Sequence, residues 1–217
     1  MVGTKRIYAG KDTKTVKKTK VVRYPRYKNM LGDSTTCSLK YVEYITLDPG
    51  VAGIPSTYVF TANGLFDPNI TAGGRQPRGF DQLKVLFDHY HVVSGSCKVT
   101  FMQGPSTVTS MIVGIQLNDD LSPSGDMIHE MENRNVTYAG LSATGDSKTL
   151  TQRFNSKSFF TLNDRQLYGN ATSNPADQAF YILFAQPIQS IDANGCVAMV
   201  EITYNVKWSE PNNVSSS

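Results

Sequence analysis

The highest density of charged side chains in this sequence is a cluster of basic residues at its N-terminal end. Residues 1–28 contain ten Lys or Arg and one acid, Asp12, so this arm has a formal charge of +9. Of the 21 Lys and Arg and 18 Asp and Glu in the chain, 11 and 17 remain in the other residues, which therefore have a charge of −6. Such a split indicates a polyanionic partner, most often nucleic acid. The candidate nucleic-acid-binding residues are Lys5, Arg6, Lys11, Lys14, Lys17, Lys18, Lys20, Arg23, Arg26 and Lys28.

These side chains would bind phosphate without recognising sequence, because each Lys or Arg that meets a phosphate releases condensed counterions. Tyr8, Tyr24 and Tyr27 lie among the charges and could stack on unpaired bases, or could be docking contacts. Residues 17–20 also match a minimal basic patch for nuclear import. A solubilising tail is the alternative interpretation of the arm.

Enzyme motifs do not occur in the sequence, which has no GxSxG, GxGxxG or P-loop pattern. We therefore predict no catalytic residue, no cofactor and no enzymatic activity. His89 and His91 flank Tyr90 and would share one face of a strand, but a metal site would need a third ligand that the sequence does not identify. The acidic run from Asp119 to Asp126 could hold calcium weakly, although it equally fits an ordinary acidic loop.

The three cysteines, Cys37, Cys97 and Cys196, are far apart and form no CxxC pair. This spacing suits neither a disulfide framework nor a zinc site, so buried free thiols are expected. No apolar stretch approaches the ~18 residues of a membrane span, and no signal peptide is evident. We therefore expect no insertion into membranes.

The arm has too few apolar side chains to offset the entropy of ordering, so we expect it to be flexible. The rest of the chain alternates apolar and polar residues between turn signals, which predicts strands. One short helix is expected from Phe80 to Tyr90, with Asp81 as a possible cap. The predicted strands are Thr36–Leu47, Tyr58–Ala62, Val92–Met102, Ser110–Leu117, Thr149–Phe160, Ala179–Ala185 and Val197–Trp208.

Roughly eight strands joined by long loops favour one antiparallel jelly roll, an all-β sandwich of two sheets, over an up-and-down barrel. The strand Val197–Trp208 alternates most cleanly and should be central. We divide the chain into the arm at 1–28, a jelly-roll domain at 29–211 and a polar tail at 212–217.

Several blocks of the sequence resemble capsid proteins of the circovirus-like viruses, which have circular, Rep-encoding single-stranded DNA genomes. The similarity covers about residues 24–102 and 197–211, and it is most specific in the blocks Asn63–Asn69 and Gly74–Gln82. The arm here is shorter and richer in Lys than circovirus arms. The blocks are Leu31–Ser34, Leu47–Gly50, Phe60–Asn69, Gly73–Gln82 and Ile202–Trp208.

The resemblance implies a T=1 icosahedral shell of sixty copies, with the arm facing packaged single-stranded DNA. It also implies a location in the virion, and in the host nucleus or cytoplasm during assembly. Three alternatives stay open: a capsid of the same fold that packages RNA, a carbohydrate-binding jelly-roll module with a basic tail, and an enzyme on a cupin-like sandwich. Lys does not distinguish the two nucleic acids, and the enzyme would need a metal triad that the sequence does not show.

Overall fold

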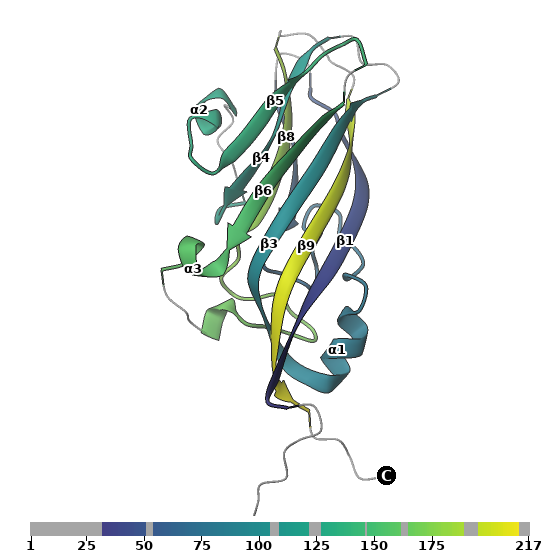
Figure 1. Cartoon of the computed structure of the whole chain (residues 1–217). Helices are drawn as coiled ribbons and strands as arrows, with labels where there is room; N and C mark the ends of the chain where they lie inside the picture. Colours follow the sequence, from purple (N-terminus) through teal and green to yellow (C-terminus); the bar gives the residue numbers. More distant parts are fainter. Residues whose placement is uncertain are drawn as a thin grey trace, which may run out of the picture.

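The computed structural model describes residues 32–50, 54–104, 109–121, 127–145, 147–161, 165–188 and 195–212. Long antiparallel strands in two facing sheets dominate these residues (Figure 1). All ten predicted arm cations lie outside the described residues.

Sheet A has the strand order β1-β9-β3-β6, and the short strand β7 pairs with the N-terminal part of β3. Sheet B has the order β2-β8-β4-β5. The strands of sheet A are β1 (Ser34–Leu47), β3 (Phe87–Gln103), β6 (Lys148–Asn155), β7 (Gly169–Asn170) and β9 (Cys196–Pro211). Those of sheet B are β2 (Ser56–Thr61), β4 (Met111–Asn118), β5 (Val136–Leu141) and β8 (Phe180–Pro187).

The chain crosses repeatedly between the sheets. Consecutive strands lie in different sheets except for the pairs β4–β5 and β6–β7, and the first and last strands are neighbours in sheet A. Two four-stranded antiparallel sheets joined in this way form a jelly roll. The predicted fold is therefore confirmed, with β7 as a small addition to the eight strands.

The inner faces of the two sheets form one hydrophobic core. Strand β9 lies between β1 and β3, and its core side chains alternate with polar ones such as Asn205 and Lys207, as the sequence predicted. The buried side chains of β9 are Val200, Ile202, Tyr204, Val206 and Trp208. At one end of the core, Trp208 contacts Phe80 and Tyr90, with ring centroids 5.7 and 5.5 Å away.

Glu43 interrupts the apolar face of β1, and the structure gives the reason. Its carboxylate accepts hydrogen bonds from the hydroxyl of Tyr41 and from the side-chain amide of Asn69, the latter at 3.1 Å. The same amide donates to the hydroxyl of Tyr58 at 2.9 Å. Glu43 thus belongs to a polar cluster that ties β1 to the loop after β2, and its charge is compensated by hydrogen bonds.

The predicted helix begins where expected but is shorter. α1 (Phe80–Leu86) has Gly79 at its N-cap, with φ of 97°, and no side-chain cap. The predicted cap was wrong, because Asp81 lies in the first turn and forms an ion pair with Lys84 at 2.6 Å. The predicted C-terminal end was also wrong. At Phe87 the chain enters β3 and pairs with Pro211, so sheet pairing overrides the helical spacing that continues to Tyr90.

Two further predictions were wrong in detail. The expected strand to Phe160 ends at Asn155, whose side chain accepts a hydrogen bond from the amide of Lys157 at 3.1 Å and caps α3 (Ser156–Phe159). The long loop after β4 contains α2 (Met127–Met131) as well as β5. The described residues therefore include three short α-helices instead of one. None of these helices has the length and apolar character needed to cross a membrane.

Candidate nucleic-acid interface

The described chain enters the fold at one end of sheet A. Strand β1 begins at Ser34, which is paired with Ser209 near the end of β9. The segment that precedes residue 32, including the predicted arm, is therefore attached at the end of the edge strand of sheet A, next to the C-terminal part of β9. The outer face of this sheet is the one turned away from sheet B. This attachment point makes the chemistry of the outer face relevant to a polyanion bound by the arm.

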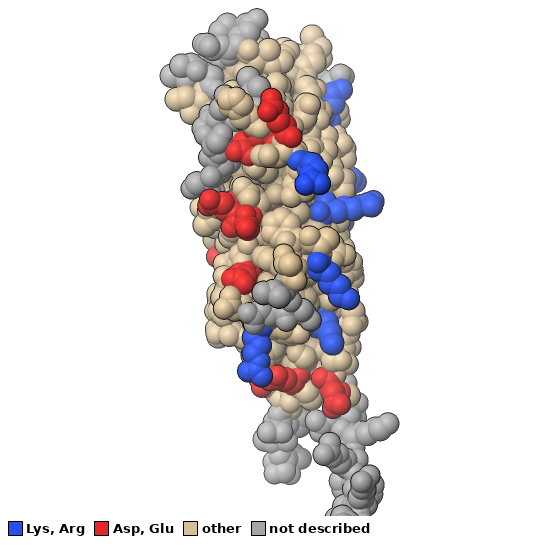
Figure 2. Space-filling model, turned by 90° about the vertical axis from the view of Figure 1, so that its left-hand side faces the viewer, with Lys and Arg blue, Asp and Glu red and all other residues tan. Residues whose placement is uncertain are grey.

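The outer face of sheet A contains basic and hydroxyl side chains. Alternation along the strands places Lys40 of β1, Lys98 of β3, Lys207 of β9 and Arg153 of β6 on this face, and all four are exposed. Figure 2 shows Lys and Arg gathered toward the right-hand edge of the molecule, where sheet A lies, and most Asp and Glu toward the centre and left. On the side of the molecule that Figure 2 shows, most basic side chains thus lie along sheet A.

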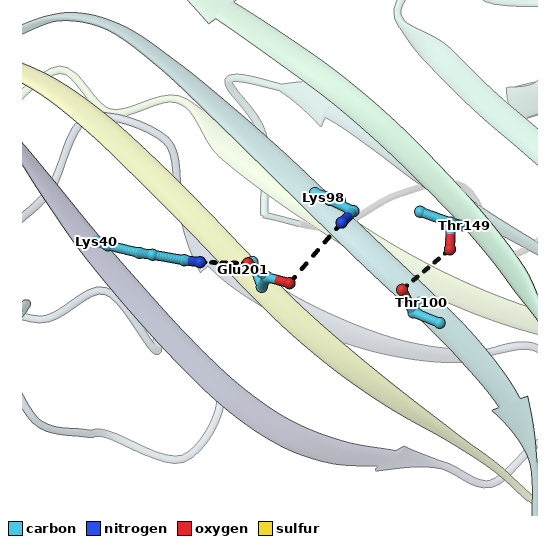
Figure 3. A network of polar contacts seen from close by, with 5 residues as sticks. All are labelled: Lys40, Lys98, Thr100, Thr149 and Glu201. Atoms are coloured by element: carbon cyan, nitrogen blue, oxygen red, sulfur yellow. Dashed lines mark hydrogen bonds and ion pairs between the residues drawn. The ribbon is translucent and has the colours of Figure 1, made fainter.

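Glu201 lies in the middle of this face and is held by two lysines (Figure 3). Its carboxylate forms an ion pair with Lys40, and the ammonium group of Lys98 lies 3.9 Å from its other oxygen. The hydrogen bond from Lys40, together with the charges of Lys40 and Lys98, lowers the pKa of the Glu201 carboxyl. One carboxylate therefore orients two cations across three strands and leaves a net positive charge of one.

Hydrogen bonds between side chains further order the outer face. The hydroxyls of Thr100 and Thr149 lie 3.0 Å apart and link β3 to β6 (Figure 3). The amide of Asn205 donates to the hydroxyl of Ser94 at 3.0 Å. Tyr44 of β1 is 68% exposed on the same face. Point charges, hydroxyls and an exposed aromatic ring are the groups that contact phosphates and stack on unpaired bases.

The two histidines lie on the outer face of β3, as predicted. His91 is nearly buried under Tyr168, with ring centroids 5.0 Å apart, and its Nδ1 lies 3.3 Å from the carbonyl oxygen of Leu167. Burial lowers the pKa of His91. Among the described residues no group of three His, Cys, Asp or Glu side chains could hold a metal ion. Asp126, part of the acidic run considered for calcium, lies outside the described residues.

The three cysteines are free, as expected. Burial raises the pKa of the Cys97 thiol well above its usual range and that of Cys196 to about 11. Both side chains are fully buried, so they behave as small apolar core residues.

The basic face of sheet A was not among the predicted sites, and the predicted arm residues lie outside the described part of the chain. The residues of this face are the polar members of the alternating strands, so Lys40 and Lys207 were visible as outward-facing positions. Only the register brings them together, because Lys40 and Lys98 belong to strands that flank β9 and are far apart in the sequence.

No protein-family model matches the chain, and no curated protein is similar to it in sequence. Among solved structures, one of tobacco necrosis virus is similar, with 13% identity, coverage of 85% of this chain and 86% of that chain, and a TM-score of 0.50. A virus-like particle of the prawn Macrobrachium rosenbergii nodavirus has 13% identity, 100% and 97% coverage and a TM-score of 0.48. The decameric BFDV capsid protein has 9% identity, 82% and 99% coverage and a TM-score of 0.42. At 13% identity the similarity to the tobacco necrosis virus structure concerns the fold alone, and it agrees with the jelly-roll topology.

Proposed function

We propose that this chain is a viral capsid protein that assembles into a closed icosahedral shell and packages single-stranded DNA through its basic arm. One observation supports this most directly. An arm with a charge of +9 precedes β1, the edge strand of a sheet whose outer face bears Lys40, Lys98 and Lys207. The arm and the outer face of sheet A would then contact the same genome. The resemblance to circovirus-like capsid proteins supports DNA and a shell of sixty copies.

In this mechanism the arm neutralises phosphates and the jelly rolls close the shell by lateral contacts. Lys binds phosphate as a point charge and makes no bidentate fork, so the arm holds the genome without selecting a sequence. The outer face of sheet A would be turned toward the interior. The loops at 66–80 and 118–147 would then lie at contacts between subunits or on the exterior. The protein would act in the virion, after assembly in the host nucleus or cytoplasm.

Two alternatives make different predictions. A capsid protein that packages RNA would give the same shell and the same salt dependence, because the phosphates are alike. A carbohydrate-binding module would give a discrete small oligomer and no protected nucleic acid. Electron microscopy of the full-length protein, followed by digestion of the extracted nucleic acid with DNase or RNase, separates all three.

The arm is tested in the full chain by charge removal. Replacing Lys11, Lys14, Lys17, Lys18 and Lys20 together with Gln should leave the thermal melt nearly unchanged and abolish nuclease-protected nucleic acid. The same five positions changed to Arg form the matched control and should still package. A full complement of protected nucleic acid in the Gln variant would contradict the proposed role of the arm.

Binding of single-stranded oligonucleotides should weaken steeply with salt. If about five arm cations meet phosphates, log K should fall with log salt at a slope of roughly −3.5, from −0.7 per phosphate contact. A slope near zero would contradict binding that is driven by contacts between arm cations and phosphates.

A further inference from the structure

A cavity lies on the outer face of sheet A, at the end where β1 begins. Ser209, His89 and Asn170 sit side by side on β9, β3 and β7, and Ser34 is paired with Ser209 on the other side. This row forms one wall of a cavity of about 610 Å³. Its lining residues are His89, Arg165, Tyr168, Asn170, Ser209 and Glu210. Pockets of about this volume hold small molecules.

The aromatic residue of the cavity, Tyr168, is supported by contacts with strand β3. Tyr168 packs on His91, and the backbone of Leu167 contacts the same imidazole. At Gly169 an added Cβ would lie 2.3 Å from the ring of Tyr90, so β7 approaches this ring more closely than a side chain would allow. The segment that contains Tyr168 and Asn170 is therefore packed closely against β3.

Glu210 contributes a carboxylate to the lining of the cavity, with 72% of its side chain exposed, and it does so at a conformational cost. Its φ is 58°, and it is the one non-glycine residue with positive φ in the described part of the chain. Left-handed backbone at such a residue is unfavourable and occurs preferentially where a side chain must be aimed. Its Oε2 lies 3.3 Å from Nδ1 of His89, a nitrogen that is shielded from solvent and has no hydrogen bond of acceptable geometry. The carboxylate is therefore not tied up by a directed bond from this ring.

The combination of groups suits a nucleobase. An aromatic ring offers a stacking surface, and the hydroxyl of Ser209 offers a donor and an acceptor. The side-chain oxygen of Asn170 accepts hydrogen bonds from the amide and hydroxyl of Thr172, so Asn170 offers the donors of its NH₂ group. The carboxylate of Glu210 would repel a phosphate, whereas the guanidinium of Arg165, which also lines the cavity, can attract the phosphate of the same nucleotide.

The carboxylate also distinguishes among the bases. Guanine presents two adjacent N–H donors, N1–H and N2–H, on its Watson–Crick edge, and both can bind one carboxylate. Adenine and cytosine present a ring-nitrogen acceptor next to their amino group, and thymine and uracil present one N–H between two carbonyls. Each of these would place an acceptor against the carboxylate, which leaves an unfavourable polar contact.

We propose that this cavity binds a guanine base of single-stranded nucleic acid, with Glu210 accepting hydrogen bonds from its N1–H and N2–H and Tyr168 stacking on its ring. The inference rests on the proposed function, since it assumes that the strand held by the arm runs over the outer face of sheet A. The cavity would add a base-selective contact to the binding of phosphates by the arm, which does not depend on sequence. The arm is joined beside Ser34, one strand away from the cavity, so one strand of nucleic acid could contact both.

The test compares three labelled oligonucleotides of nine nucleotides on the full-length protein by fluorescence anisotropy. They are oligothymidylate with G, A or T at the central position, so the phosphate charge is identical and the contribution of the arm cancels in the ratio. The G-containing strand should bind about tenfold more tightly than the T strand, the scale of one good bidentate contact. Glu210→Gln should reduce this preference to within about twofold, because an amide cannot accept both donors.

Glu132→Gln is the matched control. It removes the same charge from an exposed position that follows α2, an element that contacts β5 of sheet B, and it should keep the full preference. A strand containing 6-thioguanine at the centre gives a second measurement on the unaltered protein, since ultraviolet crosslinking should attach it within residues 165–170 or 209–210.

Equal affinities for the three strands, an equal gain for A and G, or an unchanged preference in Glu210→Gln would overturn the inference. Crosslinks confined to residues 1–28 would overturn it as well. In each of these cases steep salt-dependent binding would leave the proposed function standing. If none of the oligonucleotides binds even at low salt, the proposed function fails together with the inference.

Discussion

The register of β9 can be tested with two neighbouring substitutions, Ile202→Asp and Thr203→Asp. Ile202 is fully buried, and its cross-strand partners are Tyr41 and Cys97, which are fully buried themselves. Neither partner can neutralise a carboxylate. Thr203 lies on the outer face of sheet A, where its partners are Lys40 and Ser96.

The expected magnitudes differ widely. Truncating a buried Ile typically costs about 2–5 kcal/mol, and burying a polar group without a partner costs at least about 2 kcal/mol more. The total is comparable to the whole stability of a domain, about 5–15 kcal/mol, so Ile202→Asp should be largely unfolded. For Thr203→Asp the new carboxylate is half exposed and beside Lys40, so the change should stay within about 1 kcal/mol.

Urea unfolding followed by circular dichroism measures both variants, and sedimentation shows whether particles form. Ile202→Asp should show little cooperative unfolding and no particles, whereas Thr203→Asp should unfold with nearly the wild-type midpoint and assemble. Because a one-residue slip exchanges the two faces of a strand, the opposite pattern would refute the register. Equal behaviour of the two variants would refute the central position of β9.

Glu201→Gln should free Lys40 and Lys98 to bind phosphate. Fluorescence anisotropy should then show a higher affinity for oligothymidylate at low salt and a steeper dependence of this affinity on salt. An unchanged affinity would show that nucleic acid does not reach this face. The pKa of Glu201 is lowered in the folded protein, so its ion pairs stabilise the fold above the unfolded pKa near 4.5 and are lost as the pH falls through the folded value. Wild-type protein should therefore lose slightly more melting temperature than Glu201→Gln between pH 5 and pH 3, and equal losses would contradict the pairing. Gly169→Ala should cost about 1–3 kcal/mol in urea unfolding, because its methyl group would overlap the Tyr90 ring; a neutral effect would mean that β7 can move away from β3.

The parts of the fold that the sequence predicted are those set by local pattern. Alternation from Val200 to Trp208 identified both the strand and its buried face, because a central strand with one face in the core must alternate. The end of α1 was not predictable in this way. The apolar spacing continues past Leu86, and only the pairing of Phe87 with Pro211, more than a hundred residues away, stops the helix.

The candidate site also has one part that the sequence reveals and other parts that depend on tertiary structure. The basic arm is contiguous in sequence, so composition alone reveals it. The outer face of sheet A depends on register, since Glu201 meets Lys40 and Lys98 only after three strands have paired. The cavity beside β1 depends on a turn at Arg165–Leu167 and on a positive φ at Glu210, neither of which has a signal in residue types.

The arm and the cavity would have different roles in binding a genome: the arm would bind phosphates, and the cavity would select a base. The cations of the arm would attract any phosphate chain and respond to salt, but they would not determine which nucleotide lies at which position. Selection needs groups held in place, and the cavity around His89 lies where three strands meet and β7 is packed against Tyr90. A base bound there would set the position of the strand relative to the sheet, and the arm would then bind its neighbouring phosphates. Salt should therefore weaken binding to G-containing and T strands alike, while the ratio of their affinities stays nearly constant, because that ratio depends on uncharged hydrogen-bond donors of the base.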